Sequence, residues 1–173
     1  MLARLLRPED YGLMGMATIV LGFVGMLSDF GMSTAIVQKQ DIYPEGLCSL
    51  FWFNGAVGIV LVVAISSISP FVAHFFSQPI LIPLMSALSL NFIIGALGVV
   101  PKAMFEKALR FDITTKISMV SSLLGGILGI CAALTGWGVW ALAMQSVGGN
   151  LLGLVAVWFV SGWRPGLHFS WVD

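Results

Sequence analysis

The stretch GAVGIVLVVAISSIS at residues 55–69 decides the fold of this chain. It contains no charged side chain and is followed by Pro70. Similar runs fill most of the 173 residues, of which 58% are hydrophobic and 9% are charged. Soluble domains carry about 25% charged residues, and a helix needs about 20 apolar residues to cross the hydrocarbon core of a bilayer. The sequence therefore predicts an all-α integral membrane protein.

The apolar runs divide into five predicted transmembrane helices, and the segments between them hold nearly all the charge. Pro70 and Pro101 follow the second and third runs, and a proline inside a helix removes a backbone hydrogen bond, so we expect both helices to end there. Strands are not expected, because the runs show no alternation and lipid does not tolerate open sheet edges. The predicted spans are about 11–37, 47–69, 80–100, 113–134 and 139–160.

Small residues recur every four positions in the predicted helix 113–134. Helices in lipid associate through close backbone approach, which small side chains permit. Since only a very short turn joins this helix to the next, we expect the two to pack as an antiparallel hairpin. The two rows are Ser118, Ser122 and Gly126, and beside them Ser121, Gly125 and Gly129.

The basic residues predict the orientation in the membrane. Six of the eight lie on the side that holds the first and third connections and the C-terminal tail, and only Arg4 and Arg7 lie on the other side. Cytoplasmic loops carry the excess of basic residues, so the N-terminus of this chain is expected outside and the C-terminus in the cytoplasm. A chain that begins outside without a preceding span suggests that one helix is missing upstream.

The segment at residues 102–110 predicts a short amphipathic helix on the cytoplasmic interface. Its apolar residues fall at 104, 105, 108 and 109, while Lys102, Lys107 and Arg110 supply positive charge. Glu106 lies four residues from both Lys102 and Arg110, a spacing that favours ion pairs on a helix. These basic residues either anchor the loop inside or contact anionic headgroups or a phosphate-bearing substrate.

Asp29 is the first candidate for a functional side chain in the membrane. An ionised aspartate at the centre of a span costs about 2.5–3.5 kcal/mol on insertion scales, so such residues face a cavity or a partner. Asp29 either couples to an ion or contacts a substrate in a cavity, or it caps a helix break or pairs with a cytoplasmic lysine. Arg4, at the outer edge, either meets a pyrophosphate or anchors the chain. Milder candidates for a polar cavity or for interhelical hydrogen bonds are Asn54, Asn91, Gln145 and Asn150.

The remaining polar residues argue against several classes of function. The formal net charge is +0, which gives no reason to expect a nucleic acid partner. Two cysteines, one of them deep in an apolar run, do not predict a disulfide framework. His74 and His168 stand apart without the spacing of metal ligands. We therefore expect no metal, no cofactor and no enzyme active site.

Six segments, in this order and spacing, resemble one family of membrane proteins. They are LARLLRPEDYG at 2–12, SDFGMSTAIVQ at 28–38, FWFN at 51–54, PKAMFEKALRF at 101–111, GWGVWAL at 136–142 and WRP at 163–165. Together they resemble the polysaccharide transport branch of the multidrug/oligosaccharidyl-lipid/polysaccharide exporter superfamily. That branch includes exporters of O-antigen, capsule, exopolysaccharide and teichuronic acid. The resemblance covers essentially the whole chain.

The resemblance implies a fold and a function. The five predicted helices correspond to helices two to six of the first bundle of a MATE-like exporter, so the chain is expected to be an incomplete N-terminal half of a longer exporter. Such proteins alternate access to a central polar cavity between two bundles. The implied role is to translocate undecaprenyl-pyrophosphate-linked oligosaccharide across the bacterial cytoplasmic membrane. The implied partners are this substrate, membrane lipids and other polysaccharide assembly proteins.

Two alternatives remain open at the level of sequence. A cation-coupled multidrug exporter of the same superfamily would confer drug resistance rather than a glycan phenotype. A non-transporting membrane scaffold, the remnant of an exporter, would bind partner helices through the glycine face of the helix 113–134. A membrane glycan polymerase or transferase is disfavoured, because none of the outside loops is long enough to hold catalytic groups.

Overall fold

Five α-helices form the computed structural model, which describes residues 6–29 and 44–162, with side chains at 6–26 and 48–162. Every element in these ranges is a helix, so the predicted all-α fold is confirmed for the described part of the chain. The elements are α2 (Pro8–Asp29), α4 (Pro44–Phe75), α5 (Leu81–Lys107), α6 (Phe111–Leu134) and α7 (Val139–Ser161). Residues 30–37 of the first predicted span lie outside the described residues.

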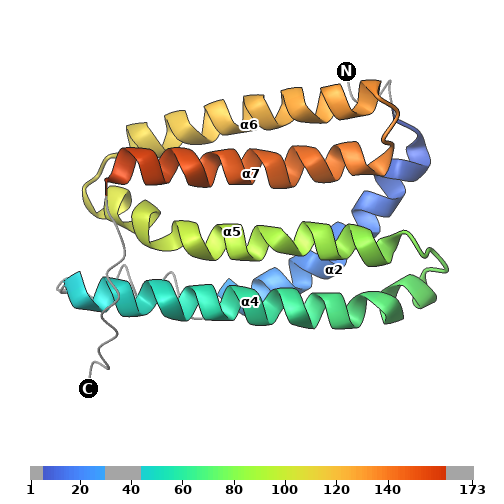
Figure 1. The fold of residues 1–173 in the computed structure, drawn as a ribbon, viewed down its shortest axis with the longest axis horizontal. Helices are drawn as coiled ribbons and strands as arrows, with labels where there is room; N and C mark the ends of the chain where they lie inside the picture. The colour runs from blue at the N-terminus through green and yellow to red at the C-terminus, as the bar shows by residue number, and fades with distance from the viewer. Residues whose placement is uncertain (1–5, 30–43, 163–173) are drawn as a thin grey trace.

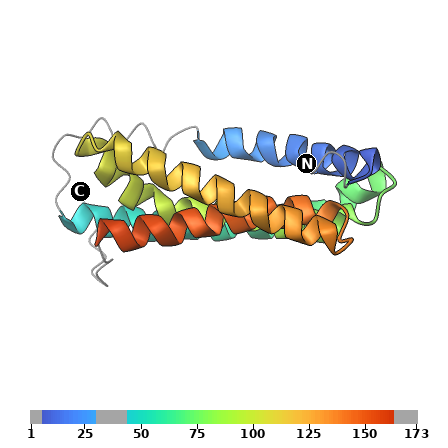
Figure 2. The same ribbon diagram turned by 90° about the horizontal axis from the view of Figure 1, so that it is seen from above.

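The helices run back and forth along one long axis, as Figure 1 shows. The closest pairings are α4 with α5, α6 with α7, and α5 with α7, so these four helices form one continuous packed layer in the order α4, α5, α7, α6. Helix α2 lies on one face of this layer and crosses it at an angle, in contact with α5 and α7 (Figures 1 and 2). The layer and the crossing helix set the position of the site.

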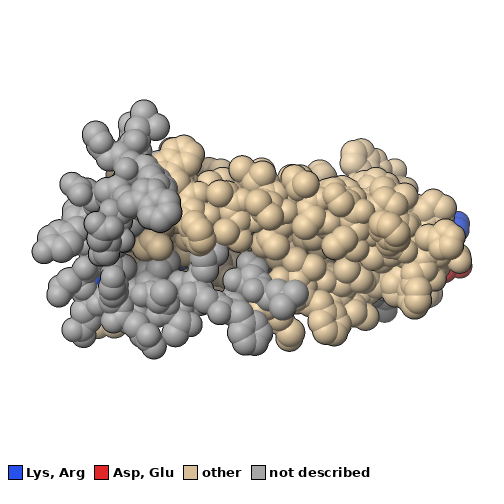
Figure 3. Space-filling model, turned by 90° about the horizontal axis from the view of Figure 1, so that it is seen from below, with Lys and Arg blue, Asp and Glu red and all other residues tan. Residues whose placement is uncertain are grey.

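Four of the five described helices, α4 to α7, have the length and composition of membrane spans. The segments Cys48–Phe75, Leu81–Lys107, Phe111–Leu134 and Val139–Ser161 are each long and apolar enough to cross a bilayer. Figure 3 shows a face almost free of charged side chains between the two ends of the molecule. A face of this kind suits contact with the hydrocarbon core of a bilayer.

Helix α4 continues through Pro70 to Phe75, so the prediction that it ends at residue 69 is wrong. Proline has no N–H, and the carbonyl of Ser66, four residues earlier, therefore loses its usual helical donor. The hydroxyl of Ser69, which is fully buried, donates to this carbonyl at 2.8 Å. A side chain one position before the proline thus replaces the missing bond and allows the helix to continue.

Helix α5 also continues through its proline, Pro101, and ends at Lys107 rather than at residue 100. Here the carbonyl left without a donor belongs to Leu97, and the indole Nε1 of Trp158 on α7 donates to it at 3.2 Å. The end of α5 turns away from the line of the rest of the helix (Figure 1), as a proline inside a helix causes.

The segment 102–110 is not a separate interfacial helix, contrary to the prediction. Residues up to Lys107 are the last turns of α5, and Arg110 precedes the first residue of α6. The tight turn between them places Leu109 at a φ of 53°. Among the described residues, neither the Lys102–Glu106 nor the Glu106–Arg110 ion pair is formed. The side chain of Lys102 lies over Gly98 instead, and the turn after Lys107 separates Glu106 and Arg110 from the i, i+4 geometry of one helix.

The predicted hairpin of α6 and α7 is confirmed, and the structure separates its two rows of small residues. A Cβ added at Gly125 would lie 2.8 Å from the Cα of Gly149, and one added at Gly129 would lie 2.8 Å from the Cβ of Gln145. A Cβ added at Gly126 would meet nothing within 4 Å. The row that contains Gly125 therefore packs on α7, and the row that contains Gly126 does not.

The apolar core lies toward the end of the bundle where α2 and α7 begin. A cluster of buried side chains from α2, α4, α5 and α7 includes Ala17, Ile65, Leu84 and Val139. A second cluster joins Leu6 to Ala132, Ala133 and Ala141, at the turn between α6 and α7. The two clusters close this end of the bundle, so an opening between α2 and the helical layer lies toward the other end.

Candidate functional site

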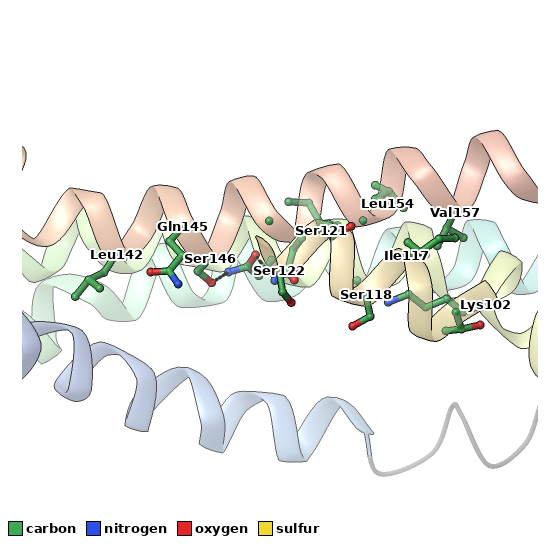
Figure 4. Close-up of a pocket in the computed structure, with 18 of the residues that line it drawn as sticks. Lys102, Ile117, Ser118, Ser121, Ser122, Leu142, Gln145, Ser146, Leu154 and Val157 are labelled. Atoms are coloured by element: carbon green, nitrogen blue, oxygen red, sulfur yellow. Dashed lines mark hydrogen bonds between the residues drawn. The ribbon is translucent and has the colours of Figure 1, made fainter. Parts of the chain in front are cut away.

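A cavity of about 770 Å³ lies between α2 and the layer formed by α5, α6 and α7. Figure 4 shows α2 on one side and the polar side chains of α6 and α7 on the other. The lining on α5 extends from Asn91 to Glu106, which corresponds to roughly 22 Å along a helix. The cavity therefore follows much of the thickness of a bilayer's hydrocarbon core.

Three polar side chains form a hydrogen-bonded chain near the middle of the cavity. The Nδ2 of Asn150 donates to the Oδ1 of Asn91 at 3.0 Å, and the Nδ2 of Asn91 donates to the Oγ of Ser146 at 3.1 Å. These bonds connect α5 to α7 at the centre of α7. Amide groups have more donors and acceptors than these bonds use. The three side chains therefore retain groups that can bind a polar ligand.

The wall contributed by α6 is a row of hydroxyl groups. Elsewhere in the bundle, the hydroxyls of Thr18, Ser67 and Ser86 each donate to a carbonyl of their own helix. None of the α6 hydroxyls in the cavity makes a hydrogen bond to another described residue, and the Oγ1 of Thr114 is buried without a partner. Ser118 and Ser122 are the exposed members of the row, so their uncommitted hydroxyls are available to a ligand or to water. The row consists of Thr114, Ser118, Ser121 and Ser122.

Lys102 brings a positive charge to the end of the cavity away from the apolar core. A Cβ added at Gly98, one turn earlier on α5, would lie 3.7 Å from the Cε and 4.0 Å from the Nζ of Lys102. The lysine side chain therefore runs back along α5 into the cavity, toward Ser118 of α6 in Figure 4. Glu106 also lines this end, but it forms no ion pair with Lys102 among the described contacts.

The structure brings some of the predicted site residues together and not others. Asn91, Gln145 and Asn150 all line the cavity. Asn54 does not: it is buried on α4, where its Nδ2 donates to the carbonyl of Leu50 at 2.9 Å. Arg4 lies outside the described residues, and Asp29 is the last described residue of α2, without a described side chain. A functional role for each of these residues stays a prediction.

Several lining residues were not singled out as cavity groups from the sequence. Lys102 was assigned to a surface helix, although a Cβ on a helix points toward the N-terminus and directs a long side chain deeper into the membrane. Ser146 lies four residues before Asn150, so it shares a helix face with that candidate. No feature of the sequence indicates Thr114 as a residue that lines the cavity. Within the described ranges, no three His, Cys, Asp or Glu side chains lie close enough to hold a metal ion.

Comparison with known proteins decides the family. The family described as polysaccharide biosynthesis protein matches residues 1–173. The chain belongs to this family. Among the curated members that the chain resembles is the lipopolysaccharide biosynthesis protein WzxC of Escherichia coli (strain K12), which is 32% identical over 98% of this chain.

Two further relatives are also named for roles in polysaccharide biosynthesis or transport. The succinoglycan biosynthesis transport protein ExoT of Rhizobium meliloti (strain 1021) is 28% identical over 98% of this chain. The teichuronic acid biosynthesis protein TuaB of Bacillus subtilis (strain 168) is 29% identical over 86% of it. The matches cover 35%, 34% and 31% of WzxC, ExoT and TuaB, so the chain spans about a third of their length. No solved structure matches the chain.

Proposed function

We propose that this chain forms part of an exporter that translocates lipid-linked oligosaccharide across the cytoplasmic membrane. The observation that carries the proposal is a cavity at membrane depth whose walls present amides and hydroxyls, in a chain of the polysaccharide biosynthesis family. Sugar hydroxyls are both donors and acceptors, and amide and hydroxyl groups match them in both roles. A relative named as a succinoglycan transport protein supports transport rather than an enzymatic activity.

The composition of the cavity wall favours a glycan over a hydrophobic drug. Sites for drug-sized molecules are lined mainly by hydrophobic and aromatic side chains. The described lining contains no Phe, Tyr or Trp, although the chain has 12% aromatic residues. A cavity with uncommitted hydroxyl donors would leave those groups unpaired against an apolar ligand, which costs free energy for each group.

The end of the cavity near Lys102 suits the phosphate groups of the substrate. A lysine ammonium is a compact positive charge, and the exposed hydroxyl of Ser118 adds a neutral donor. Glu106 offsets part of this charge at the same end. We therefore assign phosphate binding to this end and oligosaccharide binding to the amides farther along the cavity, with undecaprenyl-pyrophosphate as the carrier class.

The orientation and the wider assembly belong to the same proposal. The ends of α5 and α7, with Lys102, would face the cytoplasm, in agreement with the count of basic residues. The five helices would form part of the first of two bundles, and Asp29 and Arg4 would contribute to the cavity or its outer edge. Other polysaccharide assembly proteins would act on the substrate before and after translocation.

A chimera tests the function directly. Residues 1–173 would replace the matching segment of the succinoglycan transport protein ExoT in a strain that lacks it, and secreted succinoglycan would be measured. We expect the chimera to restore secretion, and the Asn91→Leu/Asn150→Leu variant to reduce it about tenfold or more through loss of ligand hydrogen bonds. Asn54→Leu, the same change outside the cavity, should retain secretion at equal membrane abundance.

Two results would count against the proposal. A chimera that inserts in the membrane at normal abundance but secretes no succinoglycan would favour a non-transporting scaffold. Full secretion by the Asn91→Leu/Asn150→Leu variant would remove these amides from substrate binding. Two single variants would be measured in the same chimera. Lys102→Gln removes the positive charge from the cavity, and Asp29→Ala removes the aspartate that is the first candidate from the sequence.

A further inference from the structure

A hydrogen bond from a different helix reaches α5 at its bend. Pro101 is fully buried and cannot donate a backbone hydrogen bond to the carbonyl of Leu97. The indole of Trp158 makes that bond instead at 3.2 Å, across 61 residues of sequence. At Pro70 the equivalent bond comes from Ser69 on the same helix. The hydrogen bond at Pro101 thus links α5 to α7, whereas the one at Pro70 lies within α4.

Lys102 follows directly after this bend. Its side chain lies over Gly98, with the Cε 3.7 Å from the position of a Cβ there, so the direction of the helix at Pro101 determines where the ammonium lies. The opposite wall at this point consists of Ser118 and Thr114 of α6. A change in the bend would carry Lys102 away from these hydroxyls without altering any lining residue.

The ring of Trp158 is itself fixed on two sides. It packs edge-on against Phe51 of α4, with ring centroids 5.7 Å apart and an interplanar angle of 66°. Phe51 is 6% exposed, so this contact is part of the packed layer. Such aromatic pairs prefer the edge-on geometry, which holds the indole N–H toward α5. Helices α4, α5 and α7 therefore meet at Trp158. This residue does not itself line the cavity.

We propose that Trp158 is a positioning residue for Lys102. By donating to the carbonyl that Pro101 leaves without a donor, it maintains the bend of α5 that directs the lysine ammonium into the cavity. The consequence for substrate handling rests on the proposed transport function, whereas the effect on the direction of residue 102 does not depend on it.

The first test measures the direction of residue 102 in the chain itself. Spin labels would be placed at Lys102→Cys and Ser118→Cys, in a background of Cys48→Ala and Cys131→Ser, in lipid vesicles. We expect Trp158→Phe, which retains a ring but removes the N–H, to broaden and lengthen the distance distribution between the labels. The control is Trp140→Phe, because the indole N–H of Trp140 makes no hydrogen bond to another described residue, and this variant should match the parent.

A second variant distinguishes the hydrogen bond from general packing. Pro101→Ala restores a backbone N–H that can donate to Leu97, so the indole bond is no longer needed. In that background Trp158→Phe should cause no further change in the distance. An equal broadening with and without Pro101, or no broadening in either, would overturn the proposal. Size-exclusion elution of each variant at the parent position confirms that folded protein is compared.

Transport provides the functional arm of the test. In the succinoglycan chimera, we expect Trp158→Phe to reduce secretion about two- to tenfold, the range that loss of one hydrogen bond supports. The reduction should disappear when Lys102→Gln is already present, because the lysine is the group that Trp158 positions. If the chimera never transports while the label distances respond as expected, the proposed function fails and the positioning role stands. If the losses of secretion caused by Trp158→Phe and Lys102→Gln were additive in the double variant, the positioning role would be overturned and the proposed function would stand.

Discussion

Replacing Gly125 with alanine tests the close packing of α6 on α7. The added Cβ would lie 2.8 Å from the Cα of Gly149 and 2.9 Å from the carbonyl oxygen of Gln145, both backbone atoms that cannot rotate away. Carbon atoms pack at about 3.5–4.0 Å, so the two helices must separate by about 0.7 Å or more at this point. Neither helix can achieve this by a change of side-chain rotamer alone.

The neighbouring glycine supplies a matched control for the magnitude. Gly126→Ala adds the same methyl group to the same helix, but its Cβ meets nothing within 4 Å. Both substitutions gain about 1 kcal/mol of helix propensity, which cancels in the comparison. What remains is the cost of overpacking at Gly125, about 1–3 kcal/mol. We therefore expect Gly125→Ala to be less stable than Gly126→Ala by that amount.

Unfolding by SDS in mixed micelles, followed by circular dichroism in the far ultraviolet, measures the difference. A third variant, Gly149→Ala, adds its Cβ on the opposite side of the same contact, where the nearest atoms are 3.4 Å and 3.5 Å away. These are ordinary contact distances, so its stability should lie closer to that of Gly126→Ala. Equal stability of the Gly125 and Gly126 variants, within about 0.5 kcal/mol, would refute the inference that backbone contact holds the hairpin.

Two further predictions concern the pairing of α4 with α5 and the helix that passes through Pro70. A Cβ at Gly58 would lie 3.1 Å from an alanine Cβ and 3.3 Å from backbone atoms of α5, so Gly58→Ala should be about 1 kcal/mol less stable than Gly55→Ala, whose Cβ meets nothing within 4 Å, in the same SDS titration. Ser69→Ala should cost about 1–3 kcal/mol by leaving the part-buried carbonyl of Ser66 unpaired. Adding Pro70→Ala should recover most of that loss, and a loss that persists would show that the serine contributes by packing instead.

The membrane class and the number of helical segments follow from the sequence because they depend on composition along the chain. A run without charge, long enough to cross a bilayer, has few stable alternatives to a helix in lipid. The hairpin of α6 and α7 was predictable for a similar reason. A short turn with Gly136 and Gly138 leaves little freedom in how the two helices can be placed, and both glycines adopt positive φ angles in the structure.

The ends of α4 and α5 could not be predicted in this way. Proline removes a backbone donor wherever it occurs, but whether the helix ends depends on whether another donor reaches the carbonyl. At Pro70 that donor is Ser69, the residue directly before the proline in the sequence. At Pro101 it is Trp158 on another helix, and no pattern in the sequence around Pro101 indicates it.

The sequence by itself determined that this is a membrane protein of packed helices. It also indicated Asn91, Gln145 and Asn150, because polar groups in apolar runs are costly wherever they lie. The tertiary structure decided which polar groups share one cavity. It joined Asn91 to Ser146 and Asn150 through hydrogen bonds, and it left Asn54 paired on its own helix. It also directed Lys102 inward, because the direction of that side chain depends on a bend that α7 stabilises from across the bundle.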